Sequence, residues 1–78
     1  MHRRLLSLSS REVERILRHY GFVCARVEGS HQQFVGMTHE QQRRVTVIAK
    51  QKRFAPKTVA TMIRQSGLTE REWLEVLE

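Results

Sequence analysis

Hydrophobic residues recur with a helical period near the start of the chain. Four of them are spaced i, i+3, i+4 and i+7, as on one face of an amphipathic helix: Val13, Ile16, Leu17 and Tyr20. Ser9 and Glu12 in front of this face form the pattern of a capping box, and Gly21 behind it is a typical helix end. The pattern predicts a helix over Ser10–Tyr20.

The middle of the chain has the composition of β-strands. Three segments are rich in β-branched and aromatic residues or alternate between apolar and polar ones: Phe22–Val27, His31–Val35 and Arg43–Ala49. Glu28–Ser30 is a turn, and Gly36–Gln42 is expected to be a polar loop. Connections of hairpin length predict an antiparallel three-stranded sheet.

The rest of the chain returns to helical patterns. A basic loop, Lys50–Phe54, leads to a helix that is expected to begin at Pro56 and to stop at Gly67. A second capping box, Thr69–Glu72, starts a short third helix that runs through Leu77. The fold class is therefore α+β, with the order α-β-β-β-α of a double-stranded-RNA-binding domain and an extra short C-terminal helix.

Such a sheet hides only one face under its helices, because each element has one apolar face to bury. Side chains alternate between the two faces along a strand. If Phe34 belongs to the core, His31 lies on the uncovered face, just past the turn.

Composition narrows the classes of function. The 78 residues fit a single domain, 1–78, and carry 14 Lys and Arg against 8 Asp and Glu, a net charge of +6. Such a charge favours a polyanionic partner, nucleic acid above all. A single cysteine, no apolar run of membrane-spanning length and no signal-peptide pattern predict a cytoplasmic protein without contact to a membrane. The four histidines lack the spacing of metal ligands, so no metal or other cofactor is expected.

The segment Gly29–Phe34 has the pattern GSHxxF, between a helix ending in YGF and a strand RRVTV. With these flanks it resembles the HicA (YcfA-like) toxin family, small bacterial ribonucleases of toxin–antitoxin modules. The likeness continues through Lys57–Leu68 and covers roughly Ser9 to Leu77. The resemblance implies a fold like that of double-stranded-RNA-binding domains, cleavage of mRNA, inhibition by a cognate HicB-like antitoxin, and His31 as the catalytic histidine. Many relatives carry a second histidine after the third strand, where this chain has Ile48–Lys52.

The chemistry of the residues agrees with this reading. A histidine side chain can take and give a proton near neutral pH, and RNA supplies its own nucleophile, the 2′-hydroxyl. Cations would stabilise the charge on the phosphorane. The candidate RNA-binding residues are Ser30, Arg43, Arg44, Lys50, Lys52, Arg53 and Lys57. The second proton-transfer partner stays open between water and Lys50.

The predicted function is thus the toxin of a type II toxin–antitoxin system, a metal-independent endoribonuclease that uses His31. One alternative is a non-catalytic binding module of the double-stranded-RNA-binding kind, which reads A-form shape without a catalytic group. Another is a decayed toxin that keeps the fold and the partner interface. Substitution of His31 separates these, because only the enzyme loses an activity while RNA binding survives.

Overall fold

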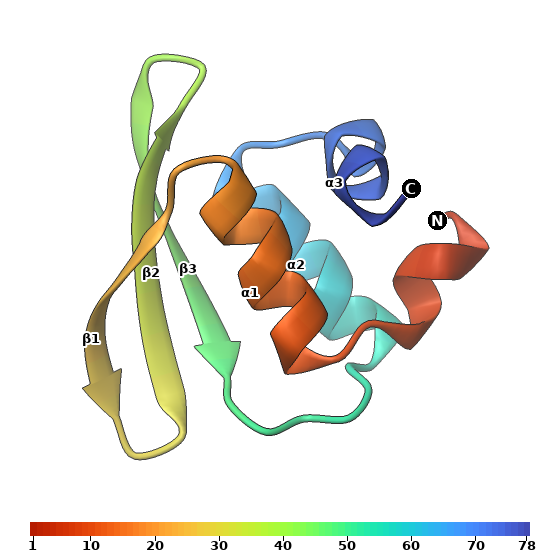
Figure 1. Ribbon diagram of the computed structural model, residues 1–78, viewed down its shortest axis with the longest axis horizontal. Helices are drawn as coiled ribbons and strands as arrows, with labels where there is room; N and C mark the ends of the chain where they lie inside the picture. Colours follow the sequence, from red (N-terminus) through yellow and green to blue (C-terminus); the bar gives the residue numbers. More distant parts are fainter.

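The computed structural model describes residues 1–78, and its elements follow the predicted order (Figure 1). They are a 3-10 helix η1 (Arg3–Ser7), α1 (Ser10–His19), β1 (Val23–Glu28), β2 (His31–Thr38), β3 (Gln41–Ile48), α2 (Pro56–Ser66) and α3 (Glu70–Leu77). The strands form one antiparallel sheet in the order β1-β2-β3. This confirms the α+β class with a three-stranded antiparallel sheet and an added C-terminal helix.

Helices cover only one face of the sheet. Helices α1 and α2 lie against it, whereas α3 and η1 lie beyond them, on the side away from the strands (Figure 1). Phe34 in the middle of β2 is fully buried, and its neighbours in register are Cys24 on β1 and Val45 on β3. His31 is exposed. As expected from the alternation of side chains along β2, Phe34 faces the helices and His31 is one of the residues on the uncovered, open face.

The connection between β2 and β3 differs from the prediction. The expected polar loop Gly36–Gln42 is mostly strand, because β2 runs on to Thr38 and β3 already begins at Gln41. Only His39 and Glu40 form the turn, and both have positive φ, 51° and 67°. A two-residue hairpin turn of this kind normally carries Asn-Gly or Asp-Gly, and neither dipeptide is present here to indicate the turn.

The N-terminal segment before α1 contributes to the core, which was not predicted. Leu5 in η1 and Leu8 after it are completely buried. The backbone N–H of Phe54 donates to the carbonyl of Leu8 over 3.0 Å, and Phe54 is itself buried. The loop after β3 is therefore fastened to the segment between η1 and α1.

Both predicted capping boxes are present. At α1 the N–H of Glu12 donates to Ser9 Oγ over 3.2 Å, and the N–H of Ser9 donates to the Glu12 carboxylate over 3.0 Å. At α3, Thr69 and Glu72 make the same pair of bonds, over 3.1 and 2.9 Å. Each box satisfies helix N–H groups that otherwise lack an intrahelical partner.

The two cap carboxylates make stability depend on pH. Burial alone would raise the pKa of Glu12, but hydrogen bonds from Arg4 and Ser9 outweigh it and lower that pKa below its usual 4.5. The backbone hydrogen bond from Thr69, helped by His39, lowers the pKa of Glu72 in the same way. A lowered pKa in the folded state gives stability that is present above 4.5 and is lost as the pH falls through the folded value.

We expect the urea midpoint of unfolding to fall as the pH drops below 4.5, the usual carboxyl value. A double variant, Glu12→Gln with Glu72→Gln, is expected to be less stable at pH 7 and to lose less on acidification, because the two linked groups are gone. Glu40→Gln, at an exposed carboxylate outside both boxes, serves as the control. The linkage is wrong if the double variant loses as much stability on acidification as the wild type.

Candidate active site

The candidate catalytic residue, His31, begins β2 directly after the turn at Gly29 and Ser30. Gly29 has a φ of 59°, a left-handed conformation that glycine adopts without steric cost. The strand register places Glu28 of β1 and Ile48 of β3 on the two sides of His31. His31 is exposed, and no side-chain hydrogen bond or ion pair engages it in the structure. Its imidazole is therefore free to meet a ligand at this end of the sheet.

The carboxylate beside His31 is already engaged. Glu28 accepts from the guanidinium of Arg26, with 3.2 Å between Nη2 and Oε2. Both side chains are largely exposed. This ion pair reduces the negative charge that an approaching phosphate would meet next to the imidazole.

The same turn is joined to the end of β3. The backbone N–H of Ala49 donates to the carbonyl of Ser30 over 2.8 Å. Lys50 follows Ala49, and His31 follows Ser30, so each residue is one position away from this hydrogen bond. The structure thus places the backbones of Ser30, His31 and Lys50 near one another.

All three lysines of the chain lie between the end of β3 and the first turn of α2: Lys50, Lys52 and Lys57. All are exposed, and none of the salt bridges in the structure uses a lysine. Their charges are therefore available to a polyanion. Arg53, in the same segment, differs from the lysines because it makes a contact within the chain: its Nε donates to the carbonyl of Leu6 over 3.1 Å. That contact ties Arg53 to η1.

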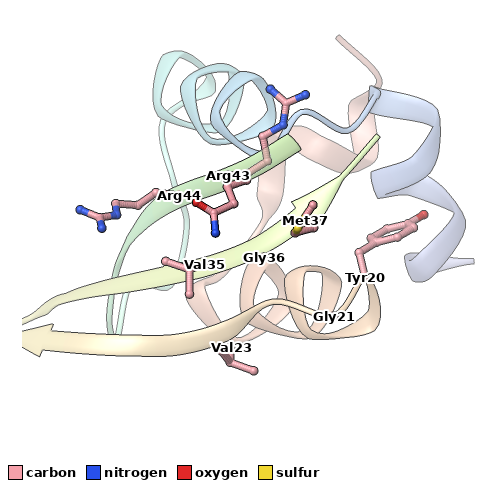
Figure 2. A pocket seen from close by; sticks show the side chains of 9 residues that line it. Tyr20, Gly21, Val23, Val35, Gly36, Met37, Arg43 and Arg44 are labelled. Atoms are coloured by element: carbon pink, nitrogen blue, oxygen red, sulfur yellow. The ribbon is translucent and has the colours of Figure 1, made fainter. Parts of the chain in front are cut away.

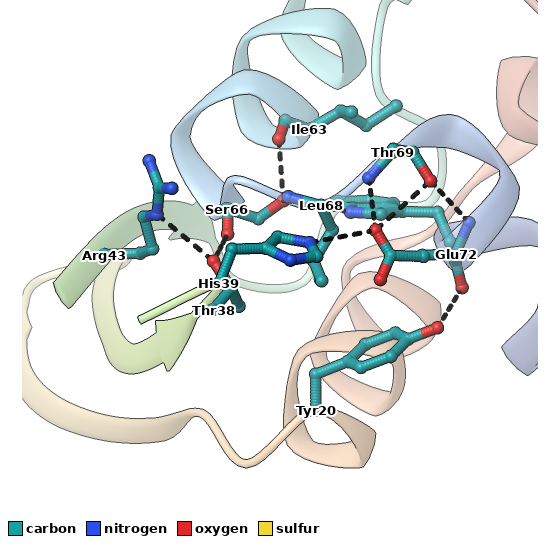
Figure 3. Close-up of polar contacts among 10 residues, drawn as sticks. Tyr20, Thr38, His39, Arg43, Ile63, Ser66, Leu68, Thr69 and Glu72 are labelled. Carbon is teal, nitrogen blue, oxygen red and sulfur yellow. Dashed lines mark hydrogen bonds and ion pairs between the residues drawn. The ribbon is translucent and has the colours of Figure 1, made fainter. Parts of the chain in front are cut away.

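The two arginines of β3 lie away from His31. Arg44 and Arg43 precede Ile48, the residue opposite His31, by four and five positions, which is about 14–17 Å along an antiparallel strand. Arg43 Nε donates to Thr38 Oγ1 over 3.1 Å, so this side chain turns toward the end of α2 (Figure 3). Arg44 is exposed and points away from Arg43 (Figure 2).

Both arginines border a hollow of about 800 Å³ at the far end of the sheet (Figure 2). Its apolar lining includes Val23, Val35 and Met37, and Val23 and Met37 are more than half exposed. Sequence reasoning missed this surface. The signal was the apolar residues at alternate positions of β2, Val35 and Met37, which share the open face with His31.

The other three histidines have contacts elsewhere. His2 Nδ1 accepts from the N–H of Arg4 and caps η1, and the ring of His19 stacks edge-on against Tyr20. His39 lies in the β2–β3 turn, 3.4 Å from the Glu72 carboxylate (Figure 3). The structure contains no group of three or more His, Cys, Asp or Glu side chains that could hold a metal ion.

A comparison of the sequence with known protein families assigns the chain to one of them. The sequence model of one family, described as the HicA toxin of bacterial toxin–antitoxin, matches residues 10–68. The chain belongs to the HicA toxin family. The match runs from the first residue of α1 to Leu68, and it includes His31 and all three lysines. A search of curated proteins finds no significant match.

Membership in the HicA family makes this chain the toxin component of a toxin–antitoxin module and implies a cognate antitoxin as its partner. The 3-10 helix η1 and the whole of α3 lie outside the matched residues, although Leu5 and Trp73 from these elements are fully buried. No helix of the structure has both the length and the apolar character needed to cross a membrane.

Proposed function

We propose that this HicA-family toxin is a metal-independent endoribonuclease that cleaves mRNA with His31 as a general acid/base. The observation that carries the proposal is the exposed imidazole at the start of β2, adjoining a segment of unpaired lysines. A histidine matches the proton transfers of the reaction near neutral pH, and nearby cations match the charge that develops on the phosphate.

The proposed reaction is a transfer of the phosphoryl group within the RNA. A base removes the proton of a 2′-hydroxyl, the 2′-oxygen bonds to the adjacent phosphorus, and the bond from phosphorus to the 5′-oxygen breaks. The leaving 5′-oxygen receives a proton. The products are one end with a 2′,3′-cyclic phosphate and one with a free 5′-hydroxyl, and the reaction needs no nucleophile from the protein or from a metal.

The partner antitoxin is expected to cover His31 with acidic groups. The chain carries a net charge of +6, and the three lysines, of which Lys50 is the one adjoining His31, have no carboxylate partner of their own. Electrostatic complementarity would speed association with an acidic partner and exclude cationic ones. An antitoxin bound over His31 would block access of the RNA phosphate to the imidazole.

The ends of the RNA products test the proposed function. A single-stranded RNA transcript incubated with the wild-type chain in excess EDTA is expected to give fragments with 5′-hydroxyl ends, which a polynucleotide kinase labels directly. Mass spectrometry should find the matching 2′,3′-cyclic phosphates. An oligonucleotide with a 2′-deoxy nucleotide at the mapped position is the control and should stay intact.

Two other results would contradict the proposal. Fragments with 5′-phosphate ends would indicate attack by an activated water molecule instead of the 2′-hydroxyl. Binding of the transcript without any cleavage would favour the non-catalytic binding module or the decayed toxin.

A further inference from the structure

Lys50 has a backbone conformation that lysine rarely adopts. Three residues other than glycine have positive φ in this chain, and two of them, His39 and Glu40, form the β2–β3 turn. The third is Lys50, with a φ of 62°. In this left-handed region the Cβ atom crowds the backbone, so a residue with a side chain is destabilised there relative to glycine. The chain therefore keeps a lysine where glycine would be more stable.

Hydrogen bonds on both sides hold Lys50 in this conformation. On one side, the N–H of Ala49 donates to the carbonyl of Ser30 over 2.8 Å. On the other side, Gln51 is fixed by Ser10 at the start of α1. The carbonyl of Gln51 accepts from the N–H and the hydroxyl of Ser10, over 2.9 and 3.3 Å, and the N–H of Gln51 lies 3.1 Å from Ser10 Oγ. Ser10 is only 6% exposed, so this contact is shielded from solvent.

Backbone strain persists where the surrounding structure determines the conformation, and it concentrates at functional sites. Packing of the Lys50 side chain does not account for this backbone conformation, because the side chain is exposed and makes no hydrogen bond or ion pair within the chain. What the arrangement fixes is the backbone position from which the lysine side chain extends. Through the bond between Ala49 and Ser30, that position is next to His31.

We infer that Lys50 is a catalytic residue whose ammonium group binds a non-bridging oxygen of the scissile phosphate, and that the contact between Ser10 and Gln51 positions it. This inference rests on the proposed function. It assigns the stabilisation of the developing negative charge to Lys50, while the proton transfers belong to His31 and to a second group. A lysine whose backbone is already held beside the site needs less reorganisation to bring its cation to the phosphate.

Replacement of Lys50 by glycine separates the charge from the backbone strain. We expect Lys50→Gly to raise the urea midpoint of unfolding, because the strain is relieved, and to lower kcat for cleavage of a single-stranded RNA transcript by about 10²-fold. Lys50→Arg should recover part of kcat, because it keeps a cation at the same place. Ser10→Ala should lower kcat without removing any charge.

Two controls match the two features of Lys50. Glu40→Gly relieves the same kind of strain, at a φ of 67°, in the turn at the opposite end of the sheet. It should raise the urea midpoint and leave kcat unchanged. Arg71→Ala removes one positive charge from the exposed face of α3 and should also leave kcat unchanged.

The outcomes distinguish this inference from the proposed function. Cleavage at the wild-type rate by Lys50→Gly, together with loss of cleavage in His31→Ala, would overturn the role of Lys50 alone. A lower urea midpoint for Lys50→Gly would overturn the strain on which the inference is built. A wild-type chain that does not cleave the transcript would overturn both.

Discussion

Replacement of His31 by alanine is expected to lower the rate of RNA cleavage by about 10²–10⁴-fold, the usual contribution of one general acid or base. The urea midpoint should stay close to that of the wild type, because exposed residues without partners contribute little to stability. Binding of an RNA that carries a 2′-deoxy nucleotide at the cleavage site should change only a few-fold, since the lysines remain. Single-turnover kinetics, urea unfolding and fluorescence anisotropy measure the three quantities.

His19→Ala is the matched control for this experiment. His19 is also an exposed histidine, but it lies at the end of α1 against Tyr20. The His19→Ala variant should cleave RNA at the wild-type rate. If His31→Ala is folded and as active as His19→Ala, the imidazole of His31 takes no part in the reaction, and another residue must be the acid or base.

The features that were predicted correctly depend on short stretches of sequence. A capping box needs two side chains three positions apart, and both boxes were identified from Ser9–Glu12 and Thr69–Glu72. The apolar period of α1 and the alternation of β2 are equally local. For that reason the exposure of His31 on the uncovered face could be predicted from the position of Phe34 alone.

The features that were missed depend on contacts between distant segments. The β2–β3 turn uses His39 and Glu40 where glycine or asparagine is usual, and His39 is held by Glu72 from α3. Ser10 and Gln51 are 41 positions apart, and no local sequence pattern around either residue predicts their contact. Tertiary structure selects these conformations, so reading the sequence segment by segment does not reveal them.

Among the cations predicted for the candidate site, one adjoins His31 in the structure and two lie far from it. Lys50 adjoins His31 because antiparallel pairing brings the end of β3 to the start of β2. The same pairing carries Arg43 and Arg44 toward the other end of the sheet, which the antiparallel order alone would have indicated. Their candidacy as RNA-binding residues therefore concerns a second region of the surface and not the phosphate next to His31.

The largest expected effect on stability belongs to Gly67, where α2 ends. Its φ is 70°, and a Cβ atom there would lie 2.6 Å from Thr38 Oγ1 and would also overlap the Arg43 guanidinium. The Arg43 guanidinium is the far end of a flexible side chain and can shift, but Thr38 cannot, because it is buried and its hydroxyl donates to the carbonyl of Ser66 over 2.6 Å (Figure 3). Displacing Thr38 would leave that carbonyl without its partner.

Gly67→Ala is therefore expected to lower the free energy of unfolding by about 2–4 kcal/mol, the sum of a left-handed alanine and a broken buried hydrogen bond. That is a large share of the roughly 4–12 kcal/mol expected for a domain of this size. Urea unfolding measures it. Gly21→Ala is the matched control, since Gly21 has a φ of 89° and no atom within 4 Å of the added Cβ. Equal losses in the two variants would show that Thr38 yields without cost and that only the backbone conformation requires glycine at position 67.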